Sequence, residues 1–367
     1  MIQVQLKLRL RPAQERQLER WLFRLTGVWN WAIRKLEADG NVGVRHSVFE
    51  MKALVNGHGR KIGVPSKAMT ALVAQACDAY DRYRGGLANR PRLKGRRNKL
   101  NSIPFDQGQL IRSDRSVYLA GLGLARFHPQ EIPAGHSGCS RIVKRASGWY
   151  LCLFIQAERE PIAVVVDGLI GVDPGFSNLL TTSDGEIIEH PDELRAGELR
   201  VAQAQRGKRE RLSARLRERG ANRRRDRNHK LSRRLVAENR LIVWSKDNTA
   251  GIARSFGKSV SSASHSQLRQ MLAYKSRAGG REFVEVASRN STRICSACRA
   301  ITGPTGYAGL SVRRWTCVCG ATHDRDVNAA VNTLIAGLGM SHERSREVAS
   351  GIVIESKPTR FMRGASQ

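Results

Sequence analysis

The pattern of hydrophobic and polar positions changes near residue 160 and divides the chain into two parts. In the first part, segments with the spacing of strands and segments with the spacing of helices occur in separate blocks. Residues 4–10 alternate apolar and polar side chains, which predicts a half-buried strand. The apolar residues of 13–32 recur at helical spacing, and residues up to 90 favour further helices. Short alternating segments return between 103 and 156, separated by glycine-rich turns. The first 160 residues therefore predict a small strand-built unit interrupted by a helical insertion.

The second part begins with a short apolar strand at Leu169–Asp173, which ends on a carboxylate. A β-hairpin across Asp184-Gly185 follows it, and further apolar strands are predicted at 241–244 and 283–286. A helix over 327–335 has apolar residues at i, i+3, i+4, i+7 and i+8. Strands that alternate with helices predict an α/β fold for this part of the chain.

The composition is strongly basic. Among 367 residues there are 63 Lys and Arg against 32 Asp and Glu, a formal net charge of +31. A folded surface with this excess repels itself unless it lies beside a polyanion, and nucleic acid is the first candidate. A membrane is the second, but the longest apolar stretch, around 162–172, is too short to span a bilayer and is interrupted by Asp167. The N-terminus lacks the apolar segment of a signal peptide, so we expect a cytoplasmic, nucleoid-associated protein.

Two segments concentrate the positive charge. Residues 89–101 are predicted to form a basic loop. The sequence is equally compatible with a loop that is only solvated and with one that binds phosphate groups. Residues 201–240 contain fifteen Lys or Arg and four acidic residues. A solvated charged hairpin is the usual explanation, but this excess is too large for i,i+4 pairs to neutralise, so we expect a phosphate-facing helical hairpin at about 195–240. The candidate phosphate contacts are Arg96, Arg97 and Lys99 in the loop and Arg223, Arg224, Arg225, Arg227 and Lys230 in the hairpin.

Four of the seven cysteines cluster near the C-terminus, as Cys295-x-x-Cys298 and Cys317-x-Cys319. This spacing is similar to that of a zinc ribbon at about 293–321, in which four thiolates surround a structural zinc ion. The second knuckle is one residue shorter than the usual C-x-x-C. Three thiolates with His323 are therefore an alternative set of ligands, and chance clustering without a metal is another.

Two carboxylates occupy positions from which hard metal ligands can project. Asp173 ends the first strand of the second part, and Asp326 lies in the first turn of the helix whose apolar face must pack on that sheet. Oxygens that converge from these positions suit Mg²⁺ or Mn²⁺. Two-metal phosphodiester cleavage also needs a third acid, expected from the central strand next to Asp173. That position holds Ser245, and the neighbouring Lys246 would oppose a second cation.

The motifs follow one another in an order that is informative as a whole. They are GVDPG at 171–175, the basic hairpin, Lys275 with Gly280, Ser291-Thr292, the first cysteine knuckle and DRDVNAA at 324–330. In this order the chain resembles the TnpB proteins encoded by insertion sequences and their relatives, the type V CRISPR effectors. The resemblance is close over about 169–337 and loose toward the N-terminus.

The resemblance implies a domain organisation. Residues 166–340 would form an RNase H-like (RuvC) domain with the zinc ribbon inserted in it. Residues 1–165 would form a β-barrel-like, wedge-type domain, with a helical recognition insertion at about 13–100. Residues 341–367, which are polar and aperiodic, would form a flexible tail.

The resemblance also implies a function. Members of this family bind a structured guide RNA, pair it with one strand of double-stranded target DNA and cut the DNA with Mg²⁺. No membrane and no small-molecule substrate is implied. Asp173 would be the first catalytic acid and Asp326 the third, and Ser245 stands where the second, a Glu, belongs.

Other positions for the missing acid also lack one. Some members of the family carry the Glu on a neighbouring strand, and the matching stretch here is Val286-Ala287-Ser288. Glu282 and Glu285 are near in sequence, but both should point away from the site if Val284 and Val286 point inward.

Three hypotheses follow from this departure. The leading one is an RNA-guided DNA-binding protein with a degenerate nuclease site, which acts as a roadblock or repressor. The second is an active RNA-guided endonuclease whose third metal ligand lies elsewhere in the chain. The third is a guide-free DNA-binding protein that assists a transposase.

Overall fold

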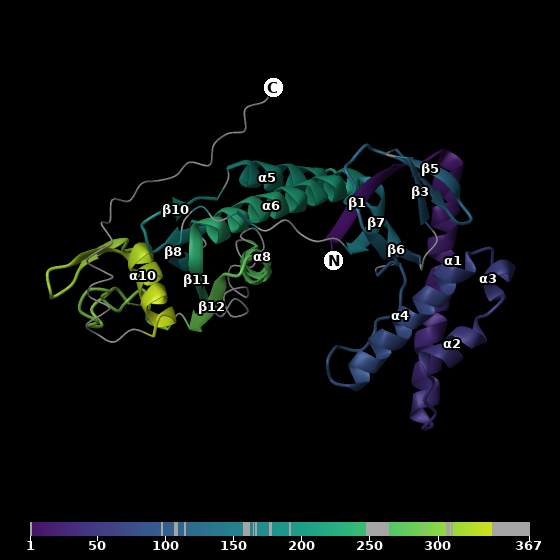
Figure 1. Ribbon diagram of the computed structural model, residues 1–367, viewed down its shortest axis with the longest axis horizontal. Helices are drawn as coiled ribbons and strands as arrows, with labels where there is room; N and C mark the ends of the chain where they lie inside the picture. Colours follow the sequence, from purple (N-terminus) through teal and green to yellow (C-terminus); the bar gives the residue numbers. More distant parts are fainter. Residues whose placement is uncertain are drawn as a thin grey trace. The chain divides into compact units, whose positions relative to one another are not determined.

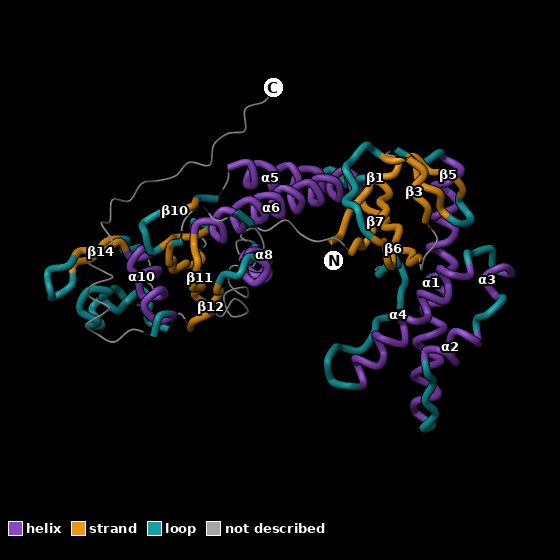
Figure 2. The backbone as a smooth tube through the Cα atoms, viewed as in Figure 1, coloured by secondary structure: helices purple, strands orange, loops and turns teal. Residues whose placement is uncertain are grey.

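The chain forms two compact units, Met1–Arg159 and Glu160–Gln367 (Figure 1, Figure 2). The computed structural model describes residues 2–96, 98–105, 109–113, 115–156, 162, 163, 165, 167–175, 178–190, 192–246, 264–287, 289–305, 309 and 311–339. Within these ranges, no helix combines the length and the hydropathy needed to cross a bilayer. The predicted tail at 341–367 lies outside the described residues.

The first unit contains a seven-stranded antiparallel sheet in the order β2-β6-β7-β1-β5-β4-β3. Its central strand β1 pairs with β7 along Ile2–Lys7 and then with β5 at Leu8 and Arg9, so that one strand joins the two halves of the sheet. The described pairings run in an open order from β2 to β3, and the predicted barrel-like closure stays a prediction. The strands are β1 (Ile2–Arg9), β2 (Ser102–Phe105), β3 (Gln109–Ser113), β4 (Ser116–Leu119), β5 (Gly123–Phe127), β6 (His136–Arg145) and β7 (Gly148–Gln156).

Helices occupy the chain between β1 and β2, where the sequence predicts an insertion. They are α1 (Pro12–Asn41), α2 (Val48–Leu54), α3 (His58–Lys61) and α4 (Ser66–Arg84). Leu18, Leu22 and Leu25 on one face of α1 are buried, as their helical spacing predicts. The side chain of Gln14 fixes the start of α1, because it accepts from the backbone of Arg11 and donates to the carbonyls of Leu122 and Leu124 at the beginning of β5.

The second unit is built on a mixed five-stranded sheet in the order β10-β9-β8-β11-β12. The strands are β8 (Gly168–Pro174), β9 (Leu180–Thr182), β10 (Ile187–Ile188), β11 (Asn239–Lys246) and β12 (Glu282–Ala287). β8, β11 and β12 are parallel, whereas β9 is antiparallel to both of its neighbours. Parallel strands are buried on both faces, which explains the nearly continuous apolar runs in β8 and β11.

Helices cover the two faces of this sheet. On one face, α6 (Glu210–Glu238) and α8 (His265–Ala278) pack on the side chains of Val172 and Trp244. On the other face lies α10 (Arg325–Gly337), whose Leu334 packs on Val243. α5 (Asp192–Arg206) packs along α6, so the predicted basic hairpin is present as two helices (Figure 1). A small hairpin of β13 (Arg314–Thr316) and β14 (Thr322–Asp324) leads directly into α10.

Gly171 permits a very close approach of α10 to β8. A Cβ added to Gly171 would lie 2.1 Å from the carbonyl oxygen of Ala330 and 2.8 Å from the Cβ of Leu334. Because backbone atoms lie on both sides of this contact, any larger residue would have to push the helix off the sheet. The first glycine of the GVDPG motif is therefore explained by packing.

We expect Gly171→Ala to lower the free energy of unfolding of the second unit by about 3 kcal/mol, as overpacking does. Urea denaturation of the full chain, followed by tryptophan fluorescence, would measure this loss. Gly197→Ala is the matched control, because an added Cβ meets nothing within 4 Å there and alanine favours a helix. Equal stability of the two variants would contradict the close contact between α10 and β8.

Candidate functional site

Asp173 and Ser245 lie side by side on the face of the sheet that α10 covers. Gly171 faces α10, and residues two apart along a strand share a face, so Asp173 also points to this side. Val243 contacts α10 in the same way, which places Ser245 on this face as well. In the parallel register Trp244 pairs with Val172, so the next residues along the two strands are Ser245 and Asp173.

Asp326 lies on the same side of the sheet, in the first turn of α10. Ala330, one turn further along the helix, is the residue that contacts Gly171. The carboxylate of Asp324 caps the helix by accepting from the backbone N–H groups of Asp326 and Val327 at 3.0 and 3.1 Å. Burial raises the pKa of Asp326, and the positive charge of Arg313, whose Nη1 donates to Oδ2 of Asp326 at 3.1 Å, opposes this shift. A partly buried carboxylate at this place is suited to hold a divalent ion.

Ser245 offers no charge to such an ion. Its side chain is fully buried, and its Oγ has no hydrogen-bond partner among the described residues. The residues of β12 on the same face near it, Val284 and Val286, are apolar, and Ser245 pairs with Val286. Within the described strands, β11 and β12 thus place no carboxylate on this face at the end where Asp173 lies.

The two glutamates of β12 occupy different places. Glu285 lies on the opposite face, where it accepts from Nη1 of Arg269 on α8 at 2.9 Å. Glu282 lies on the α10 face, contrary to the expectation that it points away, but it pairs with Leu241 at the other end of the sheet. Lys246 follows Ser245 and so lies on the α8 face, 3.9 Å from Glu285. The expectation that Lys246 opposes a cation beside Asp173 is therefore wrong, because strand alternation directs it to the other face.

The four clustered cysteines come together in space, with all four Sγ atoms within 4.8 Å of one another. Cys295 and Cys319 are 3.8 Å apart at Sγ, and Cys298 and Cys317 are 3.5 Å apart. Zn–S bonds of about 2.3 Å in a tetrahedron require sulfur–sulfur distances of about 3.8 Å. The shortened C-x-C knuckle therefore still brings Cys319 into reach of a tetrahedral ion, and the donor set fits zinc.

His323 lies beside this cluster rather than within the set of four. Its Nε2 is 3.0 Å from Sγ of Cys295, and its buried ring packs on Trp315 with centroids 4.8 Å apart. Burial raises the pKa of the Cys295 thiol to about 12. At Cys317 burial acts in the same direction, but hydrogen bonds from the backbone of Cys319 and the hydroxyl of Thr302 prevail and lower the pKa to about 6. A bound divalent ion would favour the thiolate at every position.

Two asparagines of the DRDVNAAVN segment fasten the cysteine cluster to α10. The side-chain amides of Asn328 and Asn332 both donate to the carbonyls of Ser291 and Ile294, at 2.7 to 3.2 Å. Oδ1 of Asn328 accepts from the backbone N–H of Ser296 within the first knuckle. Asn328 belongs to the DRDVNAA motif, and Asn332 follows it one helical turn later. Their i,i+4 spacing on an otherwise apolar helix is the signal that indicates a shared buried partner.

Comparison with known proteins decides the family. Residues 265–333 match the family model of the Cas12f1-like TNB domain. The chain is 37% identical over 270 residues to a putative RNA-guided DNA endonuclease of Streptomyces pristinaespiralis, which covers 68% of this chain and 66% of that relative. It is 23% identical over 334 residues to the putative RNA-guided DNA endonuclease InsQ of Escherichia coli K12, with 82% of each covered. The chain belongs to the TnpB family.

A solved structure is similar to this TnpB-family chain in fold. The cryo-EM structure of a Cas12f1–sgRNA–target DNA complex matches 87% of this chain and 82% of that one, with a TM-score of 0.55 at 12% identity. At this identity the match supports the α/β fold with its mixed sheet. The chain spans about two thirds of the length of the Streptomyces relative.

The basic residues of this TnpB-family chain differ in their exposure. Arg96 and Lys99 are exposed in the loop after α4, and Arg97 lies outside the described residues. On α6, Arg223, Arg225 and Lys230 are exposed and Arg224 is half-buried. These side chains lie at the surface of their units, and Lys230 also pairs with Asp226 at 2.9 Å.

Arg227 departs from the expectation of an exposed phosphate contact, because its side chain is buried. Its Nε and Nη2 donate to Oδ1 of Asn228 at 3.2 and 3.1 Å. Burial lowers the pKa of this guanidinium to about 10. Asn228 in turn donates to Gln267 of α8, so Arg227 belongs to a polar contact between α6 and α8.

We expect the purified TnpB-family chain to hold about one zinc ion, measured by metal analysis. Cys319→Ala should remove most of this zinc, because it deletes one of four thiolates. Cys152→Ala is the control, since it changes a cysteine that lies far from the cluster in the sequence. Retention of zinc by Cys319→Ala, combined with its loss from His323→Gln, would instead establish three thiolates with the histidine as the ligand set.

Asn328→Ala should speed the release of zinc to a chelator and lower the free energy of unfolding by about 2 kcal/mol, because it leaves the buried N–H of Ser296 unpaired. The release rate is measured by the absorbance of a metal-binding dye. Asn222→Ala on the exposed face of α6 is the control and should leave both values unchanged. If Asn328→Ala also left them unchanged, the asparagines would not fasten the cluster to α10.

Proposed function

We propose that this chain is an RNA-guided DNA-binding protein of the TnpB type in which DNA cleavage is weak or lost. One observation supports the loss of cleavage. A fully buried serine, Ser245, lies next to Asp173 at the position in the parallel strands where a third acidic ligand is needed. RNA-guided DNA binding is supported by the family to which the chain belongs and by the net charge of +31.

The arrangement of the second unit supports an RNase H-like (RuvC) assignment. The sheet is mixed, has helices on both faces, and presents Asp173 where a parallel strand ends. Asp326 comes to the same face on α10. We further propose that the first unit corresponds to the wedge-type domain with its helical recognition insertion, and that α5 and α6 contribute to the nucleic-acid-binding surface.

The chemistry of two-metal cleavage explains why one serine matters. Two divalent ions about 4 Å apart must be neutralised by carboxylates that bridge and flank them. Asp173 and Asp326 supply two negative charges, and the hydroxyl of Ser245 supplies none. Mg²⁺ or Mn²⁺ would polarise the scissile phosphate and activate water when bound. With two acids a single ion is held weakly, so the rate of cleavage falls by orders of magnitude.

Binding of nucleic acid does not depend on that site. Two relatives of this chain are named putative RNA-guided DNA endonucleases, and one protein of similar fold was determined with sgRNA and target DNA. In such systems base pairing reads the sequence, while the protein contacts the backbone through many basic residues. We therefore propose guide RNA and double-stranded DNA as partners, zinc as a structural ion, and occupancy of a DNA target at the nucleoid as the mode of action.

A cleavage assay with the co-purified RNA, its matching DNA and Mg²⁺ or Mn²⁺ tests the proposal. We expect target binding without efficient cutting by the wild-type chain. Ser245→Glu should raise cleavage at least about tenfold, because it restores a charged ligand. Ser245→Gln is the matched control, because glutamine has the same size as glutamate but no charge. This variant should not cleave. Asp173→Asn in the Ser245→Glu background should abolish the gain.

Each contrary outcome is informative. Efficient double-strand cleavage by the wild-type chain would favour an active endonuclease with its third ligand elsewhere. A random population of co-purified RNA would favour the guide-free DNA-binding protein. If Ser245→Glu binds the target as well as the wild-type chain does but fails to cut, Ser245 is not the cause of the impairment.

A further inference from the structure

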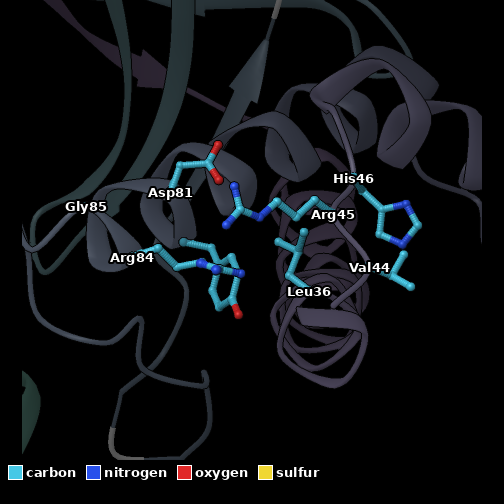
Figure 3. A pocket seen from close by; sticks show the side chains of 8 residues that line it. Leu36, Val44, Arg45, His46, Asp81, Arg84 and Gly85 are labelled. Atoms are coloured by element: carbon cyan, nitrogen blue, oxygen red, sulfur yellow. The ribbon is translucent and has the colours of Figure 1, made fainter. Parts of the chain in front are cut away.

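The first unit contains a polar cavity of about 400 Å³ where α1 and α4 end (Figure 3). Leu36 comes from α1, Val44 and Arg45 from the loop that follows it, and Tyr80 and Arg84 from the last turns of α4. The volume falls in the range of about 300 to 1,000 Å³ that is typical of small-ligand sites. None of these residues belongs to the motifs that identify the family.

The loop that forms one wall is held in place. The backbone N–H of Val44 donates to the carbonyl of Asp39 at 2.9 Å, which turns the chain back onto α1. His46 pairs with the carboxylate of Asp39, which also holds Lys35 at 2.8 Å. These bonds lower the pKa of Asp39, with Lys35 as the larger cause and His46 the next. Arg45 thus lies between two anchored residues, so the backbone of this wall is preorganised.

The other wall of the cavity is formed by α4, which approaches α1 closely. A Cβ added to Gly40 would lie 2.8 Å from Oη of Tyr80 and 3.3 Å from Nη1 of Arg84. The absence of a side chain at Gly40 therefore leaves room for the hydroxyl of Tyr80 and the guanidinium of Arg84, which both line the cavity. Tyr80 is almost completely buried, which fixes its ring, whereas Arg84 is exposed and available to a ligand.

The cavity combines three kinds of chemistry. Arg45 and Arg84 provide cations, and Asp81 provides an acceptor that points toward Arg45 (Figure 3). Leu36 and Val44 provide apolar surface. A simple anion would be opposed by Asp81 and by the negative ends of two helices, and a simple cation by two guanidinium groups. A ligand with an anionic group, a flat apolar body and an edge that donates hydrogen bonds matches the guanidinium groups, the apolar surface and the carboxylate of this cavity.

We propose that this cavity binds one unstacked nucleotide of the RNA, whose base carries an exocyclic amino group. Arg84 and Arg45 hold the phosphate, and Asp81 accepts from the amino group, as carboxylates do from cytosine. RNA is the expected source because its loops and bulges present bases that are already unstacked, whereas a base in duplex DNA must first be unpaired and unstacked. This assignment rests on the proposed function, because it takes RNA as the bound partner.

Ultraviolet crosslinking of the full-length chain to short single-stranded oligo(C), oligo(U) and oligo(dC) tests this assignment. Crosslinked peptides are mapped by mass spectrometry. We expect oligo(C) to crosslink within residues 44–46 and 80–85. Arg84→Ser should lower this yield roughly tenfold, the effect of losing a charge-assisted hydrogen bond. Arg82→Ser is the matched control, because Arg82 is exposed in the same helical turn but does not line the cavity.

The preference for an amino group has its own test. Asp81→Asn should bring the ratio of oligo(C) to oligo(U) crosslinks in these peptides close to one, whereas the exposed Asp78→Asn should leave the ratio unchanged. Equal losses in Arg84→Ser and Arg82→Ser, or crosslinks confined to other peptides, would overturn the site. Equal crosslinking of oligo(dC) would overturn the assignment to RNA.

The synthetic probes keep this proposal separate from the proposed function. If no defined guide co-purifies but the cavity crosslinks oligo(C), the guide-RNA proposal fails and the nucleotide site stands. If a defined guide co-purifies and the cavity peptides never crosslink, only the nucleotide site fails.

Discussion

The packing of α10 on β8 is the contact on which the candidate site depends. Gly171 removes the side chain that would separate the two elements, and the helix then lies against the strand at Ala330 and Leu334. One turn before Ala330 is Asp326, and two residues after Gly171 is Asp173. A single close contact between backbones therefore brings two carboxylates from distant parts of the chain to one face of one sheet.

The cysteine cluster belongs to the same arrangement. It is inserted directly before α10, and Asn328 and Asn332 bind its first knuckle from the buried side of the helix. On the other side, Arg313 precedes the β13–β14 hairpin and donates to Asp326. An ion held by the four thiolates would thus stabilise the segment that positions Asp326. The candidate metal site of the four cysteines and the candidate catalytic acid Asp326 are therefore linked through α10, although different residues form them.

Binding and cleavage make different demands on the sequence. Contact with a nucleic-acid backbone is distributed over many basic side chains, so the loss of any one changes affinity little. Cleavage by two divalent ions depends on a few carboxylates at fixed positions, so one substitution removes it. A serine at position 245 is therefore compatible with a chain that keeps its whole basic surface, its cysteine cluster and two of its acids.

The amino-acid sequence by itself determined the elements and the ligand types. Apolar periodicity placed β1, α1, β8, β11 and α10, and the spacing of four cysteines indicated a metal site, because both depend on neighbouring residues. Tertiary structure decided which residues face the site. Lys246 and Glu285 lie on the α8 face, Arg227 is buried against Asn228, and the cavity between α1 and α4 is visible only after the helices pack. Strand register and helix packing join residues far apart in the chain, and no local pattern specifies that pairing.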